Sequence, residues 1–180
     1  MKIILSIFCL LALSFCALHG NEDEQIKISI EKYFKAYQEQ DWETVVGLFH
    51  PEFMVEMRRV MLSSIDLENA SAEEREEWLK NYRVDTVEEI EKLSPKEFYL
   101  RILESTSRLE HMKVMKEINT SISDIDIQLD EGRYIAAASV ISILRDKKFT
   151  GTTMFLFEEN EGRYLIADLY KKDKKVQQVE

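Results

Sequence analysis

The spacing of apolar residues predicts two helices at the start of the chain. From Glu24 to Gln40, apolar side chains recur at steps of three and four residues, which is typical of one helix with one buried face. Asp41 is a suitable N-cap for a second, shorter helix, and Pro51 is expected to end that helix because proline cannot continue the hydrogen-bond ladder. We therefore expect a tight helical hairpin before residue 51.

The middle of the chain, from Glu56 to His111, is also helical in pattern but more acidic. Three capping boxes predict helix starts in this segment. They are formed by Ser71 with Glu74, Thr86 with Glu89, and Ser94 with Glu97. The last one, which includes Pro95, opens the most apolar helix, and the first two predict short surface helices over 71–82 and 86–93.

Beyond His111 the pattern changes to alternation of apolar and polar residues, which predicts strands. The first expected strand region runs through Val114, Ile118, Ile122, Ile125, Ile127 and Leu129. The other expected strands are Tyr134–Leu144, Phe149–Phe157 and Tyr164–Leu169. The tetrapeptide Glu-Gly-Arg-Tyr occurs at 131–134 and 161–164, where glycine suits a tight hairpin turn, and 145–148 forms a third turn. The predicted class is α+β, with N-terminal helices packed on an antiparallel meander.

The first twenty residues have the pattern of a secretory signal peptide. Lys2 precedes the apolar run Ile3–Leu13, which is long enough for a signal but short for a membrane span. We expect cleavage after Gly20 and a secreted or periplasmic protein. Lipidation of Cys16 is the less favoured alternative, because Phe15 stands where a lipobox carries a small residue.

The cysteine content and the net charge limit the classes of ligand and partner that the protein is expected to bind. The two cysteines, Cys9 and Cys16, lie in the predicted signal peptide, so the mature chain is expected to have no disulfide and no thiol ligand. The formal charge is −10, and removal of Lys2 with residues 1–20 leaves −11, which disfavours nucleic acid and anionic membranes. We expect one domain over 21–172 with an acidic helical insert near 58–92, and a flexible tail over 173–180. The only basic run, Lys171–Lys175, is expected to be solvated near this C-terminal end.

One stretch resembles a known family. This stretch runs from Asp41-Trp42-Glu43 through Leu48-Phe49-His50-Pro51-Glu52-Phe53. Together with the order of elements, it resembles the NTF2-like superfamily, which includes ketosteroid isomerase and SnoaL-type cyclases. The resemblance implies a cone-shaped fold in which helices pack on a curved antiparallel sheet around a mostly apolar pocket. It also implies a homodimer through the open sheet face, for which we expect a surface of small residues. That surface comprises Ala136, Ala138, Val140, Ser142, Thr152 and Met154.

The same resemblance bears on catalysis. In the isomerases the general base is an aspartate just after the second helix, and Met57 occupies that position here. Because a thioether cannot abstract a proton, the isomerase mechanism is not expected. His50 and Glu56 are the remaining candidates for acid or base, although His50 is better explained as a helix cap. No metal-ligand spacing and no phosphate-binding loop is found in the sequence, so neither a metal nor a cofactor is expected.

Aromatic and methionine side chains provide candidate pocket residues. The candidates are Tyr33, Tyr37, Trp42, Phe53, Met57 and Phe98. Side chains of this kind at helical spacing also fill ordinary cores, and the sequence leaves both possibilities open. The favoured function is a non-catalytic module that binds a small apolar ligand or a protein partner. The alternatives are an enzyme of the SnoaL or isomerase type that uses His50 or Glu56, and a structural homodimer.

Overall fold

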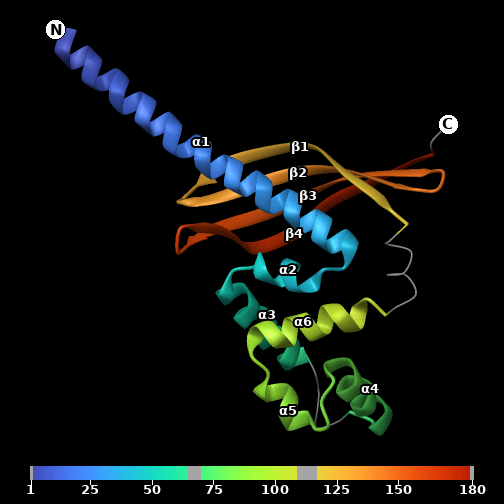
Figure 1. The fold of residues 1–180 in the computed structure, drawn as a ribbon. Helices are drawn as coiled ribbons and strands as arrows, with labels where there is room; N and C mark the ends of the chain where they lie inside the picture. Colours follow the sequence, from blue (N-terminus) through green and yellow to red (C-terminus); the bar gives the residue numbers. More distant parts are fainter. Residues whose placement is uncertain (1, 65–69, 109–116, 179–180) are drawn as a thin grey trace.

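The protein is an α+β domain in which helices pack against a curved, unclosed four-stranded antiparallel sheet (Figure 1). The structure, a computed structural model, describes residues 2–64, 70–108 and 117–178, and the side chains of 21–63, 70–108 and 117–169. The predictions for Cys16, His111 and Val114 lie outside the described side chains. Within the described residues, no helix is both long and apolar enough to cross a membrane. The predicted fold class is confirmed.

The N-terminal helix α1 (Lys2–Glu39) runs through both the predicted signal segment and the predicted first helix (Figure 1). Ile26 and Ile30 are fully buried on one face of this helix, as the apolar spacing indicates. Asp41 caps α2 (Trp42–Gly47), because its carboxylate accepts hydrogen bonds from the Thr44 N–H at 3.1 Å and the Thr44 hydroxyl at 2.6 Å. The predicted helical hairpin and its cap are confirmed.

Pro51 begins a helix instead of ending one, so that prediction is wrong. The helix α2 ends at Gly47, and α3 (Pro51–Ser64) begins at the proline. Proline is tolerated in the first turn of a helix, where its missing N–H would have no intrahelical partner. His50 supports the new start, because its Nδ1 accepts the Glu52 N–H at 3.3 Å.

The acidic middle of the chain forms three further helices, α4 (Ala72–Tyr82), α5 (Val87–Lys92) and α6 (Pro95–Thr106). The capping boxes at Ser71 and Ser94 are confirmed. Thr86 makes no capping hydrogen bond, and Glu89 instead accepts the Asp85 N–H at 2.9 Å. These helices enclose a second core cluster, separate from the main core, around three buried residues. They are Tyr82, Ile90 and Phe98.

The sheet is a meander of β1 (Asn119–Asp130), β2 (Arg133–Leu144), β3 (Lys147–Asn160) and β4 (Arg163–Gln178), in that spatial order. The two predicted Glu-Gly hairpin turns are confirmed. Both residues of each turn are left-handed, with φ of 48° and 81° at Glu131 and Gly132 and of 53° and 78° at Glu161 and Gly162. The last strand continues to Gln178, whereas the sequence predicts a tail from 173. The basic run is therefore part of an edge strand.

The two faces of the sheet differ. Ala136 and Phe155 are cross-strand neighbours with no exposed surface, and they pack under α1 in the main core. Ala137 and Met154, one residue further along, form a pair on the opposite face. The surface of small residues predicted for dimerisation is wrong as a set, because Ala136 and Ala138 are buried under the helix while Met154 lies on the other side.

The candidate functional site is a neutral cavity between helices and sheet

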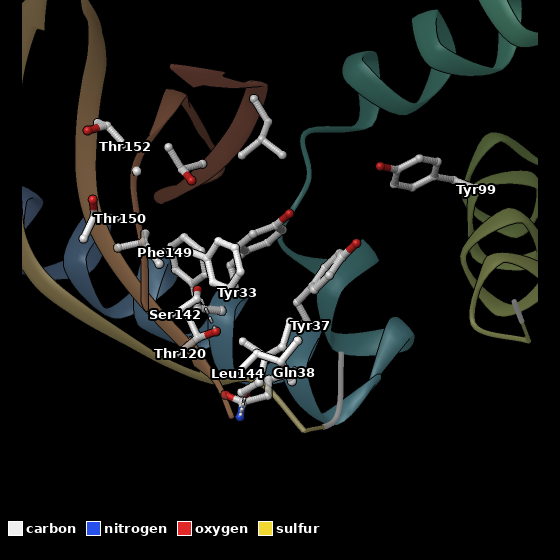
Figure 2. A pocket seen from close by; sticks show the side chains of 16 residues that line it. Tyr33, Tyr37, Gln38, Tyr99, Thr120, Ser142, Leu144, Phe149, Thr150 and Thr152 are labelled. Atoms are coloured by element: carbon white, nitrogen blue, oxygen red, sulfur yellow. Dashed lines mark hydrogen bonds between the residues drawn. The ribbon is translucent and has the colours of Figure 1, made fainter. Parts of the chain in front are cut away.

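A cavity of about 450 Å³ lies between α1, α6 and the helix-covered face of the sheet (Figure 2). Tyr33 and Tyr37 enter it from α1, and Tyr99 enters it from α6. Val140, on β2, forms part of the sheet wall. The site therefore combines residues from the N-terminal, middle and C-terminal thirds of the chain.

Packing against neighbouring rings holds the aromatic wall. Tyr33 lies edge-to-face with Phe34 and with Phe155, each at 5.5 Å between ring centroids, and Tyr37 lies edge-to-face with Trp42 at 5.3 Å. Such contacts stabilise ring orientation beyond the burial of apolar area. The wall is thus formed before any ligand arrives.

The three tyrosine hydroxyls are neutral donors at physiological pH. Burial raises the pKa of Tyr99 to about 12, with a further contribution from nearby Tyr37. Burial also raises the pKa of Tyr37, and it raises the pKa of Tyr33 further still, aided by the neighbouring phenols Tyr37 and Tyr99. Among the described residues, none of these three hydroxyls has a hydrogen-bond partner. Their hydrogen-bonding capacity is therefore available to a ligand or to solvent.

The described side chains of the sheet wall include several hydroxyl groups and no charged group. The hydroxyls of Thr120 and Ser142 lie 3.2 Å apart across β1 and β2. Gln38 donates from Nε2 to the Ile118 carbonyl at 2.9 Å, which joins the end of α1 to the chain just before β1. Among the residues whose side chains the structure describes, none that lines the cavity is an aspartate, glutamate, lysine, arginine or histidine. The described residues also contain no group of three or more His, Cys, Asp or Glu side chains arranged to hold a metal ion.

The residues predicted from sequence for the pocket separate into two groups. Tyr33 and Tyr37 line the cavity, but Trp42, Phe53, Met57 and Phe98 do not. Phe53 stacks on Phe49 with 4.8 Å between centroids, and Phe98 stacks on Tyr82 at 5.0 Å in the second core cluster. Met57 is half-buried on α3.

The candidate acid and base residues lie outside the lining. His50 is half-buried between α2 and α3, where its Nδ1 accepts the Glu52 N–H. Glu56 is exposed and forms a two-point ion pair with Arg59, whose hydrogen bonds lower the pKa of the Glu56 carboxyl. Among the described residues, the side-chain hydrogen bonds of Glu56 go to Arg59 and not to His50.

Several lining residues were not predicted from the sequence. Tyr99 follows Phe98 on α6, and one residue corresponds to about 100° of helix rotation, so Phe98 turns to the second cluster while Tyr99 reaches the cavity. Thr120 and Ser142 are 22 residues apart and become neighbours only in the β1–β2 register. The amphipathic pattern of α6 was the available signal for Tyr99.

No family model matches the chain, and no curated protein sequence matches it. The function is therefore inferred from the geometry of the cavity.

Proposed function

We propose that the protein is an exported NTF2-like module that binds a small, uncharged and largely apolar ligand in this cavity, without catalysing a reaction. The observation that carries the proposal is a cavity of about 450 Å³ with no charged side chain among its described lining residues. This volume falls in the range of about 300–1,000 Å³ that is common for small-molecule sites. The aromatic wall supplies the apolar contact surface on which such binding depends.

The lining determines the chemical class of the ligand. An ionised ligand would lose its water without gaining an opposite charge, which is costly. Unpartnered phenol groups instead favour a ligand oxygen that accepts a hydrogen bond, such as a carbonyl, ether or hydroxyl oxygen. Tyr33, Tyr37 and Tyr99 come from two helices but share one side of the cavity (Figure 2). The expected ligand has an apolar body with its oxygen directed at these tyrosines.

The enzyme alternative receives less support from the geometry. A general acid or base must come within hydrogen-bond reach of the substrate, directly or through one water. Neither His50 nor Glu56 lines the cavity, and Met57 cannot exchange a proton. A binding role requires only the groups that the cavity contains.

A neutral fluorescent dye tests the proposal. Nile red, whose emission increases in apolar sites, is expected to bind the wild-type protein and to lose at least about tenfold in affinity when Val140→Phe and Ser142→Phe together fill the cavity. Ile28→Phe is the matched control, because Ile28 is 53% exposed on α1 and does not line the cavity. Melting curves of all three proteins establish that each is folded. Equal dye affinity in the filled variant and the control would rule out this cavity as the binding site.

A further inference from the structure

A group of polar side chains occupies one end of the cavity, away from the three tyrosine hydroxyls. It consists of Gln38 on α1, Thr120 on β1 and Ser142 on β2, and all three residues line the cavity. Figure 2 shows these side chains gathered at one end, whereas the tyrosine oxygens are directed away from it. We call Gln38, Thr120 and Ser142 the polar corner.

Contacts between α1 and the first two strands bring the polar corner together. Thr120 and Ser142 are cross-strand partners, and their hydroxyl oxygens lie 3.2 Å apart. Gln38 donates to the carbonyl of Ile118, which precedes Thr120 by two residues. An extended chain rises about 3.3 Å per residue, so Ile118 and Thr120 are about 7 Å apart along the strand. The Gln38 amide is therefore held next to the pair of hydroxyls.

The bond to Ile118 fixes which way the Gln38 amide is turned. A backbone carbonyl can only accept a hydrogen bond, so the atom that faces it at 2.9 Å is the donor Nε2. Gln38 keeps the second hydrogen of Nε2 and the acceptor Oε1. Among the described residues, nothing donates a hydrogen bond to this Oε1. Gln38 thus offers one donor and one acceptor to a ligand or to solvent.

The two hydroxyls also have unused capacity of both kinds. Thr120 and Ser142 share one hydrogen bond, which uses one of their two hydrogens. One hydroxyl hydrogen and several lone pairs remain. Neither hydroxyl carries a charge, and both residues are half-buried. The polar corner is therefore neutral, and it has donors and acceptors on both the helix side and the sheet side.

We propose that the polar corner binds a neutral primary carboxamide group of the ligand, whose apolar body lies along the aromatic wall. This inference rests on the proposed function, because it names a second polar group of the same ligand. A primary carboxamide has two N–H donors and one carbonyl acceptor on adjacent atoms. Its N–H groups donate to Gln38 Oε1 and to a hydroxyl oxygen, and its carbonyl accepts from the remaining donors of the polar corner.

Other polar groups match the polar corner less well. A ketone accepts hydrogen bonds but leaves Gln38 Oε1 without a donor. An alcohol has a single hydrogen, although acceptors are present on both the helix side and the sheet side. An ammonium group would lose its water without gaining a carboxylate among the described lining residues. The carboxamide uses both kinds of group that the polar corner contains.

Two naphthalene probes that differ in one group test the proposal by calorimetry on the full chain. They are 6-methoxy-2-naphthamide and 6-methoxy-2-acetonaphthone, in which a methyl group replaces the amide NH₂. The methoxy oxygen is common to both and is available to the tyrosines. We expect the amide to bind at least about fivefold tighter, as one additional neutral hydrogen bond implies. In a site without acceptors the order is reversed, because the NH₂ group loses its water.

Variants that nearly keep side-chain volume locate the amide site. We expect Gln38→Met alone, and Thr120→Val together with Ser142→Ala, each to remove the preference for the amide and to change ketone affinity less than about twofold. Ser121→Ala is the matched control, because exposed Ser121 neighbours Thr120 on β1 but does not line the cavity. It is expected to keep the preference. Melting curves establish that each variant is folded.

The outcomes separate this inference from the proposed function. A ketone that binds the wild-type protein as tightly as the amide, or failure of both probes to bind a protein that binds Nile red, overturns the amide proposal alone. An amide preference that persists in both folded variants excludes the polar corner as its site. Failure of the two probes and of Nile red to bind contradicts the proposed function itself.

Discussion

The hydroxyl of Tyr99 offers a test of the cavity at the scale of one residue. Tyr99→Phe removes one hydrogen-bond donor and keeps the ring, which packs at 5.5 Å from Phe49. A neutral hydrogen bond contributes about 1 kcal/mol. We therefore expect about fivefold weaker binding of a carbonyl-containing ligand and unchanged binding of a hydrocarbon of similar shape, both measured by calorimetry. Equal losses for the two ligands would contradict the predicted oxygen recognition.

The same tyrosine predicts how stability depends on pH. Burial raises the pKa of Tyr99 to about 12, whereas the unfolded chain ionises near 10. The unfolded state therefore loses its proton first, so the free energy of unfolding falls as the pH rises from about 10 to 12. Each such tyrosine contributes a slope of about 1.4 kcal/mol per pH unit. Urea denaturation at pH 9, 10 and 11 should show a shallower decline for Tyr99→Phe than for the wild-type protein, and identical declines would refute this prediction.

The sequence predicted which types of residue line the cavity, but it predicted only partly which side chains point into it. Tyr33 and Tyr37 were expected in the pocket because one helix face contained them, and they line the cavity. Phe98 and Met57 were also expected there. Their placement depends on the second core cluster and on the helix start at Pro51, which are long-range packing outcomes that local spacing does not report.

At the scale of elements, the N-caps of the helices differ in how much they contribute to the free energy of unfolding. Ser94 forms a complete capping box with Glu97, whereas Thr86 makes no capping hydrogen bond. Ser94→Ala is expected to lower the free energy of unfolding by about 1 kcal/mol, and Thr86→Ala should cost only a few tenths as the matched control. Chemical denaturation measures both. A Thr86→Ala loss as large as that of Ser94→Ala would contradict the difference seen in the structure.

The elements themselves followed well from local chemistry. The Glu-Gly turns and the Asp41 cap were predicted because each depends on residues within three positions along the chain. Pro51 was misinterpreted because proline both ends helices and begins them, and the deciding contact is long-range. The His50 N–H donates to the Ile166 carbonyl at 2.8 Å, which holds the turn in place. The length of β4 was underestimated because its polar end has no apolar alternation.

At the scale of the whole molecule, contacts indicate how much of the N-terminal helix the folded domain uses. The Tyr134 hydroxyl donates a hydrogen bond to the Glu22 carboxylate, and Ile26 is fully buried one turn later. A protein lacking residues 1–20 keeps both and should melt as a single folded domain. A protein lacking residues 1–25 loses a charge-assisted hydrogen bond of about 1.5–3 kcal/mol and should melt several degrees lower.

Intact mass and calorimetry check that prediction. Exported protein is expected to begin within a few residues of Asn21. In the protein that starts at residue 21, Tyr134→Phe should lower the melting temperature by most of the amount that removal of residues 21–25 does. A full-length N-terminus, or a lipid on Cys16, would contradict the predicted processing.

Two backbone hydrogen bonds between the first helices and the last strand determine when the chain can finish folding during synthesis. The segment that joins α2 to α3 exchanges backbone hydrogen bonds with Ile166, through the Leu48 carbonyl at 2.9 Å and the His50 N–H at 2.8 Å. More than 110 residues separate these partners in the sequence. Contacts of such large separation form late, because a long loop must close first. While the ribosome is still making β4, the first helices lack their final backbone partners, so the nascent domain remains incompletely folded until β4 has been made.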